Sequence, residues 1–226
     1  MTQVATRTPA PAPPARWNTR RSGWRLGLHW FGVVCLMVAA GFGGYVVWLL
    51  WGTGLSTQHA QNELRSGFEH LIDTKDPSQA PDRIPIGDAY AQLLIPSIGV
   101  NFMVVQGTEY EDLKLGPGHY VDTANPWDDT GRVGIAGHRT TYLHPFYNLD
   151  KVSPGDRITL RTEFGTYDYV VNRVFAVNEY GSGRVLEQTN EPSLVLTTCH
   201  PKYFSSQRLI VTADRVLTRG RRRDAA

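Results

Sequence analysis

Cysteine is nearly absent from this chain, which has only Cys35 and Cys199 among its 226 residues. Cys35 lies within a long apolar run, so Cys199 is the one cysteine of the polar part of the chain. A disulfide within that polar part is therefore excluded, although small extracellular domains often depend on such bonds. The thiol of Cys199 is then either an inert buried group or a nucleophile.

A strong excess of one charge is also missing. The chain has 23 Lys and Arg residues against 21 Asp and Glu, for a formal net charge of +2, so nothing indicates a nucleic-acid partner. The arginines gather before the apolar run, at Arg16, Arg20, Arg21 and Arg25, and again near the C-terminus from Arg219 to Arg223. The second group predicts a solvated basic tail at 218–226, with contact to an anionic surface as the alternative.

No charged side chain occurs from Leu26 to Leu55. A helix of about 20 apolar residues suffices to cross the hydrocarbon core of a bilayer. Tryptophans flank the run as an aromatic belt would place them, at Trp24, Trp30, Trp48 and Trp51. The run predicts one transmembrane helix over 25–55. A core helix of a soluble protein would instead carry charges on one face.

Orientation follows from the arginines on the N-terminal side of the run. The positive-inside rule places the N-terminus in the cytoplasm and the rest of the chain outside, in a single-pass protein of the cell membrane. A cleaved signal peptide is the alternative, but its apolar region is usually about 7 to 15 residues and ends at an A-x-A-like site. The longer run here, with no such site close behind it, favours an anchor.

The segments on either side of the apolar run are poor in large aliphatic residues. The Pro- and Ala-rich start of the chain predicts a disordered cytoplasmic tail at 1–24. The polar stretch 56–88 contains Pro77, Pro81 and Pro85 and predicts an extracytoplasmic linker, with a short amphipathic helix within Gln58–Ile72.

The pattern changes at Ala89, where short runs of Val, Ile, Tyr and Thr alternate with Gly, Pro and Asp turns. Strands at this spacing predict an all-β domain over 89–217, a barrel or a sandwich. Single helical turns are predicted at Glu111–Leu115 and Phe146–Leu149. The predicted strands are Ala91–Ile95, Met103–Gln106, Gly131–Ala136, Arg157–Thr162, Tyr167–Val177, Leu194–Thr198 and Leu209–Val216.

Three polar residues of this domain are candidates for chemistry. Cys199 ends an apolar run and precedes Pro201, which places the thiol at a strand end where a substrate can reach it. His138 follows Gly137 where another strand breaks, and imidazole suits proton transfer and thiol activation. Arg208 opens the last strand, and a hairpin would bring its guanidinium beside the thiol. Taken singly, each residue has a plain structural explanation as a buried thiol, a surface histidine or an edge charge.

The arrangement Ala136-Gly137-His138, Leu196-Thr197-Thr198-Cys199 and Arg208 resembles the signature of the sortases, cysteine transpeptidases of Gram-positive cell surfaces. The resemblance covers residues 89–216, and the N-terminal anchor matches the usual sortase layout. It implies an all-β fold, a closed barrel of about eight strands with short helices. One departure is Val195, where many sortases have Thr, and we expect it to affect packing rather than activity.

Three further segments of the sequence resemble class E sortases of actinobacteria, with class D as the alternative. They are Ile95-Pro96-Ser97-Ile98-Gly99-Val100, Gly116-Pro117-Gly118-His119-Tyr120 and Thr197-Thr198-Cys199-His200-Pro201.

The resemblance implies a mechanism and a set of partners. Cys199 would attack the Thr carbonyl of a Leu-Ala-x-Thr-Gly (LAxTG) or Leu-Pro-x-Thr-Gly (LPxTG) signal on a surface protein and form a thioacyl enzyme. An amine of the peptidoglycan precursor, lipid II, would then accept the protein. His138 would protonate the leaving amine, and Arg208 would hold the substrate and stabilise the oxyanion. Tyr120 matches the tyrosine that class E uses to prefer Ala over Pro; Thr197, Thr198 and Ala136 are the other candidate substrate contacts.

Other functions remain open at this stage. An L,D-transpeptidase is also an extracytoplasmic Cys–His enzyme, but its cysteine follows a Ser-x-Gly pattern and Cys199 follows Thr-Thr. A membrane-tethered β-domain that binds peptides without catalysis would leave Cys199 dispensable. A metal site among the histidines and Cys199 is disfavoured, because no pair has zinc-finger or H-E-x-x-H spacing. We therefore predict no metal and no cofactor.

Overall fold

The computed structural model describes residues 22–48 and 52–216. The tail predicted at 218–226, most of the tail predicted at 1–24, and positions 49–51 of the predicted span lie outside the described residues. Contacts divide the chain into two compact units, Met1–Tyr45 and Val46–Ala226.

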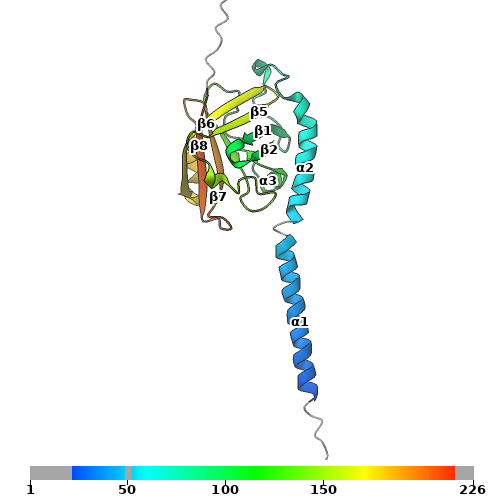
Figure 1. Cartoon of the computed structure of the whole chain (residues 1–226). Helices are drawn as coiled ribbons and strands as arrows, with labels where there is room; N and C mark the ends of the chain where they lie inside the picture. The colour runs from blue at the N-terminus through cyan, green and yellow to red at the C-terminus, as the bar shows by residue number, and fades with distance from the viewer. Residues whose placement is uncertain (1–21, 49–51, 217–226) are drawn as a thin grey trace, which may run out of the picture. The chain divides into compact units, whose positions relative to one another are not determined.

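One long helix, α1 (Ser22–Val47), accounts for the described part of the first unit (Figure 1). Its stretch Gly23–Val47 is long and apolar enough to cross a membrane. At 1.5 Å per residue, 25 residues span about 37 Å, which exceeds the roughly 30 Å hydrocarbon core of a bilayer. No side chain of Gly23–Val47 is buried by protein, and Leu36 and Met37 are 72% and 64% exposed. A helix that is apolar on all sides needs an apolar environment that the described protein does not supply.

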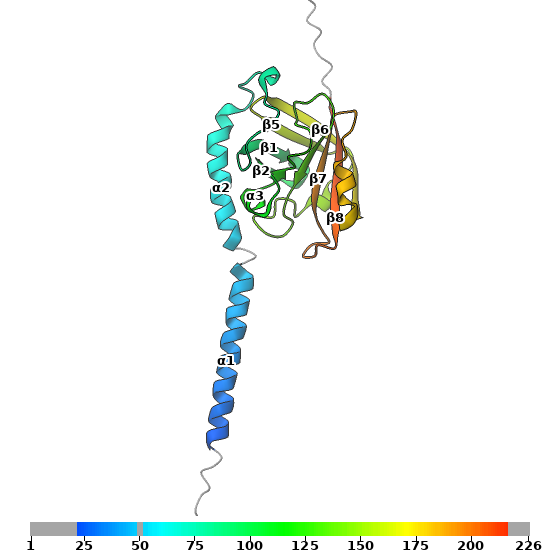
Figure 2. The ribbon, with the colours of Figure 1, turned by 180° about the vertical axis from the view of Figure 1, so that it is seen from behind.

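The second unit is built on a closed eight-stranded β-barrel (Figures 1 and 2). The order around the barrel is β1-β2-β3-β4-β7-β8-β6-β5, with the pairs β2–β3 and β4–β7 parallel and the others antiparallel. Closure leaves no open sheet edge for another strand to join. The strands are β1 (Ala89–Ile95), β2 (Val100–Gln106), β3 (Gly118–His119), β4 (Arg132–Ala136), β5 (Arg157–Thr162), β6 (Gly165–Asn178), β7 (Ser193–His200) and β8 (Gln207–Arg215).

The predicted all-β fold and closed barrel are confirmed, and each predicted strand is present with ends that shift by three residues at most. The two-residue strand β3 was not predicted, because the glycine-rich Gly116–Gly118 segment carries no period-2 pattern. Short helices join the strands: α3 (Tyr110–Leu115) and the 3₁₀ helices η3 (Glu69–Leu71), η4 (Pro77–Gln79), η5 (Pro96–Ile98), η6 (Leu149–Lys151) and η7 (Glu179–Leu186).

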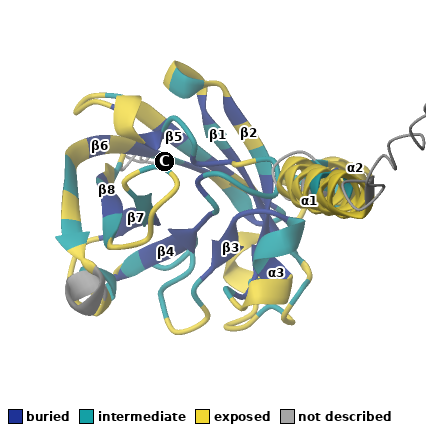
Figure 3. Ribbon diagram, turned by 90° about the horizontal axis from the view of Figure 1, so that it is seen from below, coloured by how far each residue is buried: buried dark blue, intermediate teal, exposed yellow. Residues whose placement is uncertain are grey.

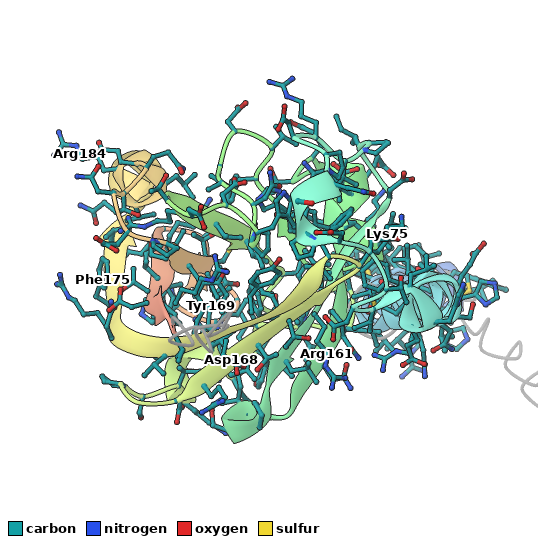
Figure 4. All side chains as sticks on the ribbon, turned by 90° about the horizontal axis from the view of Figure 1, so that it is seen from above. Lys75, Arg161, Asp168, Tyr169, Phe175 and Arg184 are labelled. Atoms are coloured by element: carbon teal, nitrogen blue, oxygen red, sulfur yellow. The ribbon has the colours of Figure 1, made fainter. Side chains whose placement is uncertain are left out.

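The barrel interior is filled by aliphatic and aromatic side chains. In β6, Tyr167, Tyr169 and Val171 alternate with exposed or half-exposed neighbours and point inward, as period-2 pleating requires. Figure 4 labels Tyr169 in the core and its neighbour Asp168 on the same strand. Every residue of β7 from Ser193 to Thr198 is buried, which agrees with its unbroken apolar run. Figure 3 shows the buried stretches on the strands and the exposed ones on the connections.

Helix α2 (Thr53–Phe68) packs against the barrel and α3 (Figure 2). The buried side chain of Gln61 donates to the carbonyls of Met103 (2.9 Å) and Leu115 (2.8 Å) and accepts from the amide of Met103 (2.7 Å). The Thr57 hydroxyl donates to the Lys114 carbonyl at 2.8 Å. These bonds fix α2, which includes the first part (56–68) of the region 56–88 expected as a linker, to the same part of the barrel as α3.

Candidate active site

The antiparallel pair β7–β8 brings the candidate nucleophile and cation together. Cys199, the penultimate residue of β7, is paired directly with Arg208, the second residue of β8. The guanidinium Nη1 of Arg208 also donates to the carbonyls of Ser205 (2.9 Å) and Gln207 (3.2 Å) in the connecting hairpin. Cross-strand partners have Cβ atoms about 5 Å apart, so the hairpin holds the cation within reach of the thiol.

The parallel pair β4–β7 places His138 at the same end of the barrel. Ala136 of β4 is paired with Thr197 of β7, and the amide of Gly137 donates to the Thr197 carbonyl at 3.1 Å. The buried Thr198 hydroxyl donates a hydrogen bond to the Gly137 carbonyl at 2.7 Å. A Cβ at Gly137 would come within 2.6 Å of the Phe146 ring, so only glycine fits directly before His138.

All seven site residues predicted from the sequence line one groove of about 230 Å³. They are Cys199, His138, Arg208, Thr198, Tyr120, Thr197 and Ala136. Thr108, Gly137 and Leu113, the last from α3, complete the lining. Larger cavities of about 440 and 450 Å³ lie along α2 and β1, but they are lined by neither cysteine nor histidine, so the chemistry selects the smaller groove.

Burial shapes the acid–base behaviour of His138. Desolvation lowers the pKa of its imidazole below the ordinary value near 6.5, because the charged form loses water contacts. Its Nε2 atom is buried and has no hydrogen-bond partner within residues 22–48 and 52–216. The Tyr142 ring lies against it, with ring centroids 4.9 Å apart and planes tilted by 37°. A ring nitrogen without a partner keeps its capacity for a hydrogen bond, which a proton-transfer group needs.

Tyr120 and Thr197 are linked across the groove. The Tyr120 hydroxyl lies 3.0 Å from the Thr197 hydroxyl, and either oxygen can be the donor. The bond holds the phenol beside β7, two residues before Cys199. Its position is suitable for contact with a substrate side chain bound next to the thiol.

Arg139 is a component of this region that the sequence analysis did not single out. Its side chain is only 2% exposed, donates from Nη1 to the Cys199 carbonyl (3.2 Å) and forms an ion pair from Nη2 to Asp150 (3.0 Å). A buried guanidinium needs such partners to offset its desolvation. It therefore ties the loop after β4 to the backbone of the nucleophile. Its place directly after His138 is visible in the sequence, but its burial is not.

His119 packs in the protein interior and is not one of the residues that line the groove. Its ring stacks on Tyr90 at 4.1 Å, and its nitrogens lie 2.9 Å from Gln106 Oε1 and 3.1 Å from the Ala124 carbonyl. Burial lowers the pKa of His119 to about 4. Within the described parts of the chain, no three His, Cys, Asp or Glu side chains are grouped to hold a metal ion, and both cysteines are free.

Comparison with known proteins gives a consistent result. The Sortase domain family model matches residues 93–216, from within β1 to the end of the described barrel and including every groove residue. Sortase D of Bacillus subtilis (strain 168) is 29% identical over 192 residues, which cover 80% of this chain and 93% of that protein.

Solved sortases also share the fold. A Clostridium perfringens sortase D5 transpeptidase superposes with a TM-score of 0.62 at 26% identity, over 70% of this chain and 99% of that one. Sortase E1 from Streptomyces coelicolor, solved with a tripeptide in its active site, gives 0.54 at 29% identity over 58% and 90%. With a family match over more than half of its length, a closed eight-stranded barrel and a cysteine at the end of β7, the chain belongs to the sortase family of cysteine transpeptidases.

Proposed function

We propose that this chain is a membrane-anchored sortase that cleaves a C-terminal sorting signal between Thr and Gly and transfers the protein to an amine of the cell-wall precursor. The observation that carries the proposal is the direct pairing of Cys199 with Arg208 in the groove that His138 also lines. A nucleophile, a proton-transfer group and a fixed cation at one strand end are the parts that acyl transfer requires.

The reaction takes place in two acyl-transfer steps. The Cys199 thiolate adds to the Thr carbonyl, and Arg208 stabilises the oxygen that becomes negative. The Thr–Gly bond breaks when protonated His138 gives its proton to the leaving amine, which leaves a thioester on Cys199. His138, now neutral, takes a proton from the incoming amine as that nitrogen attacks the thioester. The new amide leaves, and the released Cys199 thiolate and the His138 imidazolium start the next cycle.

For the sorting signal, we propose the class E preference for LAxTG over LPxTG, with class D specificity as the alternative. Tyr120 in the groove, linked to Thr197, supports this assignment, and Thr197, Thr198 and Ala136 are the other proposed contacts. Relatives from both classes occur among the similar proteins, at 29% identity each. The proposed acceptor is the amine of lipid II.

For location, we propose that 25–55 is an uncleaved membrane anchor with a cytoplasmic N-terminus, that 56–88 and the catalytic barrel 89–217 are extracytoplasmic, and that 1–24 and 218–226 are tails. The apolar helix α1 and the arginines that precede it support this arrangement. Anchoring the enzyme on the same surface as its tethered substrates raises their effective concentration.

The test uses the full chain in detergent micelles with LAxTG and LPxTG peptides, a glycine amine, and mass spectrometry of the products. Cleavage between Thr and Gly with transfer to the amine is expected, with LAxTG preferred and no product from Cys199→Ala. His138→Ala is the second inactive variant. If a folded enzyme with a reactive thiol cleaves neither peptide, the proposed sorting activity is wrong.

A further inference from the structure

The loop that follows His138 has an unusual backbone. Tyr142, Leu143 and His144 are three successive non-glycine residues with positive φ angles, of +52°, +60° and +41°. L-residues visit this left-handed region singly and at an energetic cost, so three in a row persist only where surrounding contacts hold them. Such strained segments gather at functional sites, and this one begins four residues after the imidazole.

Contacts on several sides hold the loop in this conformation. The Leu143 side chain lies against α2, where a methyl group added at Gly54 would come within 3.3 Å of its Cδ2 atom. The His144 ring meets the Tyr147 ring edge-on at 5.4 Å, and the His144 amide donates to the Thr141 carbonyl at 2.8 Å. The start of the loop is held by Arg139 on the Cys199 carbonyl.

The result of this conformation is the placement of Tyr142. Its ring packs on the His138 imidazole, and its hydroxyl lies 2.9 Å from the hydroxyl of Tyr110, the first residue of α3. The Tyr110 ring meets the Tyr142 ring edge-on at 6.3 Å and carries the Lys114 ammonium 4.4 Å from its centroid. Since α3 is bonded to α2 through Thr57, the tyrosine pair connects His138 to a fixed part of the barrel.

The tyrosine pair lies outside the groove lining, which on the α3 side consists of Thr108 and Leu113. The contact that Tyr142 makes at the site is the one with the His138 ring. We propose that Tyr142 is a positioning residue that fixes the plane of the His138 imidazole, with Tyr110 as the anchor of its hydroxyl; the inference depends on the proposed proton-transfer role of His138.

Tyr142 also excludes water from the imidazole. Burial lowers the pKa of His138, and the Tyr142 ring is one of the groups in contact with it. The charged and titratable groups in the same region are Cys199 and Arg208 across the groove, Arg139 next in the chain, and Lys114 and Glu111 beyond Tyr110. Removing the ring should admit water and move the pKa of His138 back toward its ordinary value.

The experiment compares Tyr142→Ala, Tyr142→Phe, Tyr110→Phe and the Tyr110→Phe/Tyr142→Phe double variant in the full chain. For Tyr142→Ala we expect kcat for the sorting peptide to fall about 100-fold with KM little changed, because a misplaced imidazole slows proton transfer without weakening binding. Each Phe variant should lose about 2- to 10-fold in kcat. The double variant should lose no more than either single one, since both remove the same hydroxyl–hydroxyl bond.

The matched control is Tyr167→Phe, which removes a buried hydroxyl that donates to the Phe164 carbonyl in the core, away from the groove. It should lose stability without loss of kcat. A second readout is the NMR titration of the His138 ring, assigned by its absence in His138→Gln. The pKa should rise in Tyr142→Ala and stay in place in Tyr167→Phe.

Two results would overturn the inference. One is wild-type kcat and an unchanged His138 titration in Tyr142→Ala. The other is a raised KM at constant kcat, which would make Tyr142 a substrate contact. Failure of the proposed function is a separate result: the wild-type chain would then cleave neither peptide, whereas the titration of the His138 ring requires no activity.

Discussion

At the scale of single residues, the cation beside the thiol offers the sharpest test of mechanism. The Arg208 guanidinium donates to two hairpin carbonyls, at Ser205 and Gln207, and the residue is paired with Cys199 across the strands. Lysine has a point charge and cannot present this planar set of donors. For Arg208→Lys we expect kcat/KM for peptide cleavage to fall by about 100- to 1,000-fold.

Cleavage rates and thermal unfolding should be measured together on Arg208→Lys. The exposed Lys151→Arg change is a control that should keep wild-type rates. A lysine variant with near-normal kcat/KM would mean that position 208 needs only a positive charge. The planar guanidinium would then not be required.

His119 predicts how the stability of the fold depends on pH. The imidazole is neutral in both states above its ordinary pKa of about 6.5, and its folded-state pKa is about 4. As the pH falls from 6.5 toward 4, the unfolded chain binds a proton that the folded chain does not, so the free energy of unfolding decreases, by up to about 3 kcal/mol. Urea unfolding near pH 7 and near pH 4.5 measures this loss.

Variants isolate the contribution of His119. His119→Gln lowers stability at both pH values through lost contacts, but the difference between the two should shrink because the titrating group is gone. The exposed His70→Gln should retain the wild-type difference. Equal pH sensitivity in His119→Gln and wild type would assign the acid loss to other groups.

At the scale of elements, short-range patterns predicted much of the site. The strand before Cys199 and the break at Gly137 are local features, and the parallel register of β4 and β7 then brings the two ends together. The contribution of Arg139 and the contact between Tyr142 and His138 could not be predicted. Both contacts depend on which groups the loop after β4 meets once the barrel has closed. The hydrophobic periodicity of the sequence carries no information about such contacts.

The packing of helix α2 against the barrel is another feature that the sequence could not predict. Its polar composition predicted a linker segment with a short helix, and the sequence gives no indication that Gln61 is buried. The surface that accepts it consists of main-chain groups of Met103 and Leu115, which become available only when β2 and α3 are in place. The residue type alone does not reveal whether a polar side chain is buried among carbonyl groups or exposed to solvent.

Gln61→Ala tests whether α2 is part of the folded domain. The change leaves a buried amide and two carbonyls without partners, so we expect the free energy of unfolding to fall by about 2–4 kcal/mol. Urea unfolding checks it, with the exposed neighbour Asn62→Ala as the matched control. If both variants were equally stable, α2 would not contribute to the stability of the barrel.

At the scale of the whole molecule, two chemically different units share one chain. One contains an apolar helix long enough to cross a membrane, and the other is a closed barrel with its own core. The chain has one thiol in each, at Cys35 and Cys199. Because the barrel has a single thiol, chemical labelling of Cys199 can test the proposed orientation of the chain in the membrane.

In a Cys35→Ser background, Cys199 is the only thiol, half exposed in the groove. If the barrel is extracytoplasmic, a membrane-impermeant maleimide added to intact cells should label the chain as completely as it does after the membrane is opened. Carbonate washing should leave the labelled chain in the membrane fraction, because an apolar helix of this length does not leave lipid. The Cys35→Ser/Cys199→Ala variant controls for labelling elsewhere. Labelling that requires lysis would place the barrel in the cytoplasm, away from tethered surface proteins and the wall precursor, and would contradict the proposed location while leaving the chemistry of the groove unchanged.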